Sequence, residues 1–149
     1  MANSIQYAKT VSTPSVKLDT NELTGRVRVA FAEYEASAEQ STITMFTIPN
    51  GARLLSGTVS HDALAASTTL SVGFAGYTNA AGTAVTLDVD GYKAAAASTA
   101  ATSSDALVTM ALGRNSVVDA NEDGLPVTVT LAGDDGTGTI QLQMFYVLD

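Results

Sequence analysis

The chain has no cysteine and no tryptophan, and charged residues make up only 15% of its 149 residues. The absence of cysteine excludes disulfide bonds, thiolate nucleophiles and cysteine-ligated zinc, so the fold must be stabilised by packing, backbone pairing or subunit contacts. A hydrophobic content of 46% is enough to bury one sizeable core in a chain of this length. We therefore expect a single domain over residues 23–149, preceded by an N-terminal arm over residues 1–22.

Long apolar runs and an excess of basic residues are also missing. The N-terminus lacks the apolar run of about 7 to 15 residues that follows the basic start of a signal peptide. No stretch approaches the roughly 18 apolar residues that cross a bilayer, so we expect a soluble chain with no membrane partner. Seven basic and fifteen acidic side chains give a net charge of −8, which repels a phosphate backbone. We therefore expect no nucleic-acid partner.

The charge is unevenly distributed along the chain. Residues 1–28 hold four basic and two acidic side chains, whereas the remainder is strongly acidic. One interpretation is chance segregation in a solvated arm, and the other is an arm that docks on an acidic neighbour. Residues 1–20 have too few apolar side chains to fold alone. The arm is therefore either a frayed terminus or a segment ordered by lying across a neighbouring subunit.

Apolar and polar residues alternate with a period of two in several runs, the pattern of a strand with one buried face. The clearest run is residues 125–131, where every second residue is Leu or Val. Strands are expected over residues 27–31, 42–48, 52–60, 70–74, 85–89, 105–112, 125–131 and 139–148. Turn-forming Asn, Asp and Gly separate several of these runs, which is typical of a sandwich or barrel.

The alanine-rich region around residues 90–104 is predicted to contain a helix and a loop instead of strands. The alanine-rich segment DGYKAAAAS predicts a short helix over about residues 91–98, with Asp90 as its cap. The low-complexity segment 97–104 predicts an exposed loop. The expected fold is all-β: an antiparallel β-sandwich or jelly-roll-like barrel of about eight strands, with one short helix and an extended N-terminal arm.

The alternation also predicts which side chains form the core and which face other molecules. The expected core side chains are Val27, Phe31, Leu70, Val72, Val127, Val129, Leu142 and Met144. Arg26 and Arg28 fall on the face opposite Val27 and Val29, so they are candidates for an interface with another protein. Lys17, in the basic arm, is a further interface candidate.

Catalytic chemistry finds little support. The single histidine, His61, lies beside Asp62, but a catalytic triad also needs a nucleophile that this base could activate. No serine stands in a G-x-S-x-G elbow. We interpret His61 as a residue that hydrogen-bonds its own turn, and we expect no enzyme activity, no catalytic residue and no cofactor.

The segment DANEDG is the sharpest local motif. Asp119, Asn121 and Asp123 place oxygen ligands at alternate positions and Gly124 follows them, as in the first half of a calcium-binding loop. The twelfth position is Thr130 where a bidentate glutamate is needed, and a strand follows where a helix should. We therefore favour an acidic turn, and these three residues remain a weak calcium candidate.

Aromatic residues amount to only 6% of the chain and include no tryptophan, so the stacking surface of a sugar site would have to come from tyrosine. Tyr77 and Tyr92 lie in or near expected loops. Such residues fit either a glycan-binding surface or a subunit interface. Both remain interface candidates.

Three segments resemble the strand and turn pattern of phage head structural proteins: IPNGARLLSG, ASTTLSVGFA and GLPVTVTLAGDDGTGTIQLQMFYVL. The likeness is greatest to small capsid decoration proteins of short-tailed phages, including phages of cyanobacteria, and covers roughly residues 23–149. The resemblance implies a virion protein on the outer surface of the head. Such a protein forms a homo-oligomer, often a trimer, and binds the major capsid protein to reinforce the shell. The alternative hypothesis is a head- or tail-attached module that recognises a host-surface glycan.

Overall fold

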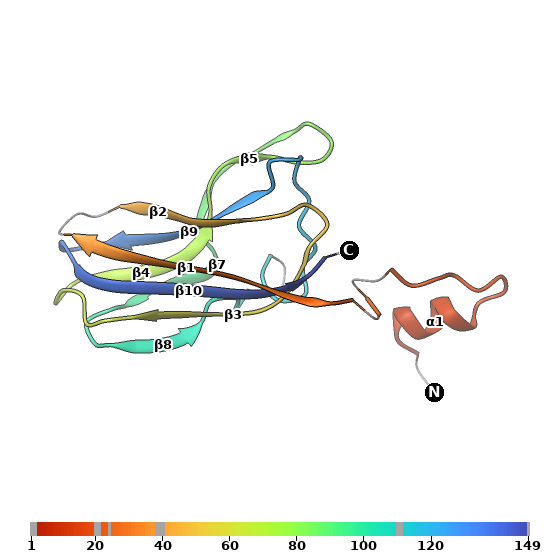
Figure 1. The fold of residues 1–149 in the computed structure, drawn as a ribbon, viewed down its shortest axis with the longest axis horizontal. Helices are drawn as coiled ribbons and strands as arrows, with labels where there is room; N and C mark the ends of the chain where they lie inside the picture. The colour runs from red at the N-terminus through yellow and green to blue at the C-terminus, as the bar shows by residue number, and fades with distance from the viewer. Residues whose placement is uncertain (1–2, 20–21, 24, 38–40, 110–111, 149) are drawn as a thin grey trace.

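The alternating runs form two antiparallel sheets that pack face to face as a sandwich (Figure 1). The computed structural model describes residues 3–19, 22–23, 25–37, 41–109 and 112–148. Over these residues the sheets do not close into a barrel. The expected all-β fold is confirmed, and of its two forms the sandwich is the one observed.

The described part of the chain contains one helix and ten strands, against the eight or so strands expected. The elements are α1 (Ile5–Val11), β1 (Val27–Ser37), β2 (Thr42–Ile48), β3 (Arg53–His61), β4 (Thr69–Phe74), β5 (Tyr77–Thr78), β6 (Ala84–Val85), β7 (Asp88–Ala97), β8 (Thr102–Asp105), β9 (Leu125–Ala132) and β10 (Thr137–Val147). The first sheet has the strand order β1-β10-β3-β8, and the second has the order β2-β9-β4-β7. Strands β5 and β6 form a separate two-stranded hairpin.

The core lies between the inward faces of the two sheets. Leu142 and Met144 of β10 face it from the first sheet, and Val72 and Val129 face it from the second; all four are completely buried. Each such side chain contributes roughly 1.5–3 kcal/mol through removal from water. Six of the eight expected core residues are confirmed as buried. Val27 and Phe31 are the two exceptions.

The expected helix over residues 91–98 is wrong, because this segment belongs to strand β7. Strand β7 pairs with β4, with Val72 opposite Lys93 and Leu70 opposite Ala96. Gly73 makes this pairing possible, since a Cβ atom there would lie 2.0 Å from the carbonyl oxygen of Asp88. Local helix propensity is therefore overridden by long-range pairing along the edge of the second sheet.

Two neighbouring expectations are also corrected. The segment expected to be a loop contains strand β8, whose residues 102–105 pair with β3. Residues 106–109 of the expected strand 105–112 form no strand, although Ala106 and Leu107 are buried. Residues 110–111 lie outside the described residues. Because alanine, serine and threonine dominate residues 94–104, period two gives no signal where the strand lies.

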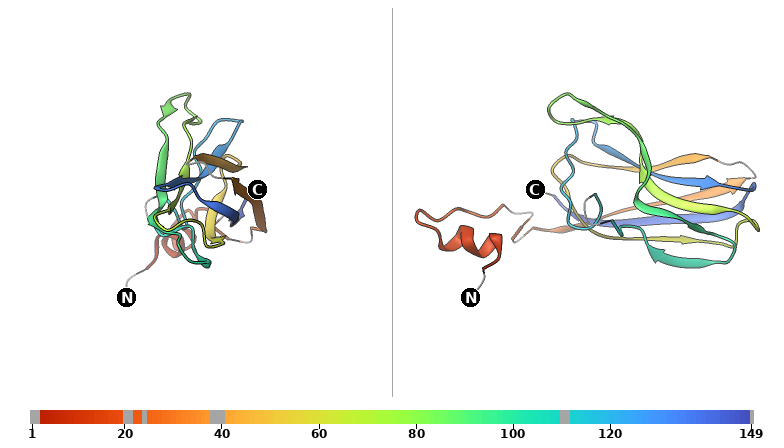
Figure 2. Two further views of the ribbon diagram at one scale, coloured as in Figure 1. Left: turned by 90° about the vertical axis from the view of Figure 1, so that its left-hand side faces the viewer. Right: turned by 180° about the vertical axis from the view of Figure 1, so that it is seen from behind.

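The N-terminal arm extends beyond one end of the sandwich, as Figures 1 and 2 show. Its helix α1 begins after Ser4, whose side chain accepts a hydrogen bond from the backbone N–H of Tyr7 at 3.1 Å. Lys9 of the helix forms an ion pair with Glu22 at 3.1 Å, which holds the described parts of the arm against each other. No residue of this helix is buried. Among the described residues, no helix is long and apolar enough to cross a membrane.

Candidate functional site

Strand β1 carries an apolar stripe that faces solvent. Val27, Val29 and Phe31 are 61%, 56% and 57% exposed, respectively. We call these three residues the β1 stripe. In the β1–β10 register, Val29 lies opposite the half-buried Phe145 of β10, which extends the apolar area beside the stripe, whereas Val147, opposite Val27, is buried. The stripe lies on the outer face of the first sheet, away from the core.

The expectation that Val27 and Phe31 belong to the core is therefore wrong. The inward face of β1 instead carries small side chains, and Ala30 and Ala32 lie opposite the buried Met144 and Leu142 of β10. Period two identifies residues that share a face, but it does not identify which face is buried. The sequence pattern located the stripe and placed it on the wrong side.

The stripe also lies at an exposed edge. Strand β1 ends the first sheet, so one side of its backbone pairs with β10 and the other has no partner strand in the order observed. Strands of this kind readily pair or pack with another chain. The arm adds further exposed apolar side chains, namely Ile5, Tyr7, Val11, Val16 and Leu23. Contiguous exposed apolar surface marks a site of protein association.

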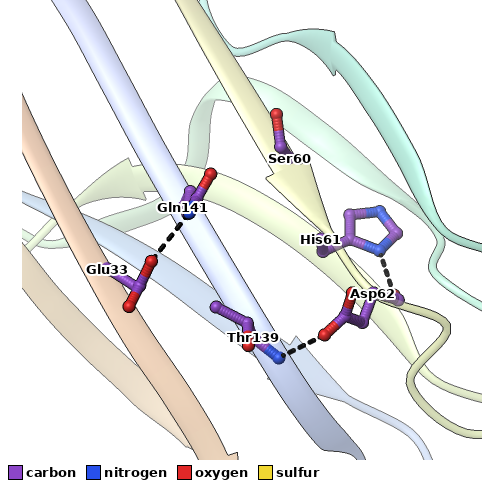
Figure 3. A pocket seen from close by; sticks show the side chains of 6 residues that line it. All are labelled: Glu33, Ser60, His61, Asp62, Thr139 and Gln141. Atoms are coloured by element: carbon purple, nitrogen blue, oxygen red, sulfur yellow. Dashed lines mark hydrogen bonds between the residues drawn. The ribbon is translucent and has the colours of Figure 1, made fainter.

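The opposite end of the same outer face is polar and forms an open pocket (Figure 3). Glu33 of β1 accepts a hydrogen bond from the Gln141 side chain at 2.7 Å. Asp62 accepts one from the backbone N–H of Thr139 at 3.0 Å. These carboxylates are engaged with polar neighbours on adjacent strands, so the outer face divides into an apolar half and an acidic half.

His61 and Ser60 border this pocket without forming a catalytic pair. The Nδ1 atom of His61 lies 2.7 Å from the carbonyl oxygen of Asp62, which confirms that the histidine hydrogen-bonds its own turn. The hydroxyl of Ser60 donates to the hydroxyl of Ser103 on β8 at 2.9 Å. The only histidine of the chain is therefore committed to a backbone contact, and the adjacent serine to a neighbouring strand.

The calcium candidates lie in a turn before β9. The amide nitrogen of Asn121 donates to the carboxylate of Asp123 at 2.8 Å, and the Asn121 side-chain oxygen accepts from the Asp123 N–H at 3.2 Å. Asp119 is oriented elsewhere, because its Oδ1 accepts from the backbone N–H of Ala80 at 3.2 Å. Among the described residues, no cluster of three metal-ligating side chains is present. The acidic-turn interpretation agrees with these hydrogen bonds.

The cationic interface candidates lie at or near the junction between the arm and β1. Lys17, Arg26 and Arg28 are all exposed. Arg28 lies opposite Tyr146 in the register. It therefore shares the face of β1 that carries Ala30 and Ala32, and it lies near the start of the strand. Among the described residues, the ion pairs are those of Lys9 with Glu22 and of Arg114 with Asp105. The three candidates are thus available for contact with another chain.

The tyrosine candidates are brought together, but not as exposed loop residues. Tyr77 is half-buried in β5, and Tyr92 is 2% exposed in β7. Both rings pack against Phe74, with ring centroids 5.7 Å apart in each pair. Burial raises the pKa of Tyr92, and the nearby Tyr77 raises it further. Because its ring is enclosed, Tyr92 offers no open face on which a sugar could stack.

The sandwich described above is also found in chains of two solved phage capsids. A chain in the capsid of Ralstonia phage GP4 has a TM-score of 0.60 and 22% identity, with 84% of this chain and 86% of that chain covered. A chain in the cyanophage Pam1 capsid asymmetric unit has a TM-score of 0.56 and 18% identity, with coverage of 84% and 86%. No protein-family model and no curated protein matches the sequence. The chain therefore shares the fold of these phage capsid chains.

Proposed function

We propose that this chain is a structural protein of a phage head, which forms a homo-oligomer and decorates the outer surface of the assembled shell. The observation that carries the proposal is the β1 stripe, three large apolar side chains more than half exposed on an edge strand. The shared fold with chains of two phage capsids supports the same function. The hydroxyl beside His61, that of Ser60, donates to Ser103, and His61 contacts a backbone carbonyl, so the proposed role is structural.

The β1 stripe is the proposed surface for self-association. Full burial of a Val or Phe side chain contributes about 1.5–3 kcal/mol, and these side chains have roughly half of that still to gain. A closed ring of copies covers every stripe and every β1 edge, whereas an open arrangement leaves one uncovered. A two-fold dimer also closes; we propose a trimer because three arms then contact the shell at once.

The arm is the proposed contact with the shell. It carries exposed Ile5, Val11 and Val16 together with the cationic Lys17, and it extends beyond the sandwich. In an oligomer, several arms contact neighbouring copies of the major capsid protein at once. Such multivalency lets modest individual contacts hold the shell together, because each further arm binds at a high effective concentration.

The location of the protein in purified virions tests this function. Mass spectrometry of gradient-purified particles should detect the chain in many copies per head, and cryo-electron microscopy should show its density on the outer surface of the shell. Detection in the tail alone, inside the shell, or only in the infected-cell lysate contradicts decoration. The proposed oligomer is tested separately, by light scattering on the isolated protein.

A further inference from the structure

A cavity of about 180 Å³ lies on a different part of the molecule from the β1 stripe. Residues from separate segments line it, including Phe74 at the end of β4, Tyr77 of β5 and Tyr92 of β7. Leu112 and Asp119, from the connection between β8 and β9, complete the part of the lining that matters here. The cavity therefore exists only once β4, β5, β7 and this connection are in place.

Tyr92 brings a phenol to the cavity. The residue is 2% exposed, and its ring packs against Phe74. Among the residues that the structure describes, no group hydrogen-bonds with this hydroxyl. The oxygen is not among the fully buried polar atoms that lack a partner, so it is accessible from the cavity and a ligand that enters can hydrogen-bond with it.

Asp119 supplies the negative charge of the lining, which has no basic side chain. Its Oδ1 accepts from the Ala80 N–H at 3.2 Å, and its second oxygen has no partner among the described residues. Tyr77 lies close to this carboxylate: burial raises the pKa of Tyr77, and the charge of Asp119 raises it further. One aspartate and two tyrosines thus line a cavity whose other walls are mainly apolar.

We propose that this cavity binds a basic side chain, lysine or arginine, of a neighbouring polypeptide. The aliphatic stem contacts Phe74 and Leu112, while the charged end donates to Asp119 and to the tyrosine oxygens. A neutral apolar group makes no use of the carboxylate, which is exposed and stays hydrated, and an anion is repelled by it. The chemical class of the ligand follows from the cavity; only the source of the side chain rests on the proposed function.

Titration with n-butylammonium, a lysine side-chain analogue, tests the ligand class directly. The chain has no tryptophan, and two of its five tyrosines, Tyr77 and Tyr92, line the cavity, so a tyrosine fluorescence change that is reduced in Tyr92→Phe reports on the cavity. We expect saturable binding of n-butylammonium and binding at least about tenfold weaker for n-butanol, which has the same stem and no charge. Equal affinity for the two compounds, or no saturable response, overturns the proposal.

Matched variants assign the binding to this cavity. Asp119→Asn should weaken n-butylammonium binding by about tenfold, because the amide keeps the acceptor for Ala80 and loses the charge. Asp123→Asn makes the same change in net charge four positions away, outside the lining, and should leave the affinity unchanged. Tyr92→Phe keeps the packed ring and should also weaken binding. If Asp119→Asn and Asp123→Asn behave alike, the site is wrong.

The same two aspartate variants identify the source of the side chain. If Asp119→Asn weakens self-association relative to Asp123→Asn in sedimentation velocity, a second copy of this chain supplies the lysine or arginine side chain. If it weakens only co-sedimentation with purified shells, another head protein supplies it. If neither assembly changes while n-butylammonium binding is lost, the cavity binds amines but no neighbouring polypeptide, and that part of the proposal is overturned. If the original protein and every variant fail to bind shells while n-butylammonium still binds, the proposed decoration function is contradicted and the cavity proposal is not.

Discussion

Val29 of β1 lies directly opposite Phe145 of β10, and both belong to the outer face of the first sheet. The pair places a β-branched and an aromatic side chain next to each other where no second layer covers them. Cross-strand pairs of this kind stabilise a sheet from either face. On the outer face, they also leave apolar area for another chain to bury.

Val29→Glu should abolish self-association while the fold is retained. A charge in the middle of the stripe must lose its hydration to enter an interface, but on the free protein it stays in solvent. Light scattering should therefore show a monomer, with a thermal midpoint close to that of the original protein. Thr44→Glu, an exposed position on β2 of the other sheet, is the matched control and should keep the oligomer. An oligomer of unchanged size for Val29→Glu contradicts the assignment of the stripe.

Val27→Ala and Leu142→Ala should separate the two faces of the first sheet by stability. Val27 is 61% exposed, so its truncation should change the free energy of unfolding by less than about 0.5 kcal/mol. Leu142 is completely buried, so its truncation should cost about 2–5 kcal/mol. Urea unfolding at a concentration where both variants have the same oligomeric state measures the difference. Similar losses for the two variants mean that Val27 is a core residue after all.

These contrasts show how far the sequence alone leads. The strand predicted at residues 42–48 has the bounds observed for β2, although the alternation in this run is less regular and the strand contains a register shift between Thr44 and Phe46. Alternation fails for β7, where four alanines follow Lys93, since alanine fits an edge strand and a helix equally well by size. Alternation also fails to predict which face of β1 is buried. That face is determined by the pairing of β1 with β10 and not by any property of Val27 or Phe31.

The candidate sites were harder to predict than the fold, for a related reason. Tyr77 and Tyr92 were recognisable as isolated aromatic residues, but their meeting around Phe74 depends on the pairing of β4 with β7 and on the β5–β6 hairpin. Asp119 joins them through a hydrogen bond to Ala80, across 39 positions of sequence. A period-two pattern predicts which residues share a face of a strand, but it does not predict which strands are neighbours. A cavity built from distant segments therefore leaves no local signal in the sequence.

Gly73→Ala should strongly destabilise the second sheet. A Cβ atom at this position would lie 2.0 Å from the Asp88 carbonyl oxygen, and that backbone cannot retreat without breaking the β4–β7 pairing. We expect loss of the folded protein or a fall of several kcal/mol in unfolding free energy, in the upper range of roughly 4–5 kcal/mol for point variants. Gly76→Ala is the matched control, because its nearest non-neighbouring atom would lie 3.4 Å away. Equal stability of the two variants would contradict the close backbone approach.

Stability should fall as the pH rises above the ordinary tyrosine pKa of about 10. Burial raises the pKa of Tyr92 in the folded protein, so the folded state binds the phenol proton more tightly than the unfolded state. The stabilisation is complete below the unfolded pKa and is lost as the pH increases through the folded one. Urea unfolding between pH 8 and 11, as an approximate range, should show this decline, and Tyr92→Phe should reduce it. A decline of the same size in the variant assigns the effect to other groups.

Removal of residues 1–22 should leave the sandwich intact and impair binding to the shell. The hydrogen bonds recorded for the arm connect its own residues, such as Lys9 with Glu22, and helix α1 buries none of its side chains. The truncated chain should therefore keep the thermal midpoint of the full chain. Because the β1 stripe remains, it should also keep its oligomeric state, so that any loss of co-sedimentation with shells is attributable to the arm. If the truncated oligomer binds shells with unchanged affinity, the contact must lie on the sandwich. If instead it dissociates into folded monomers, the arm completes the interface between copies, and the stripe alone is too small to hold them together.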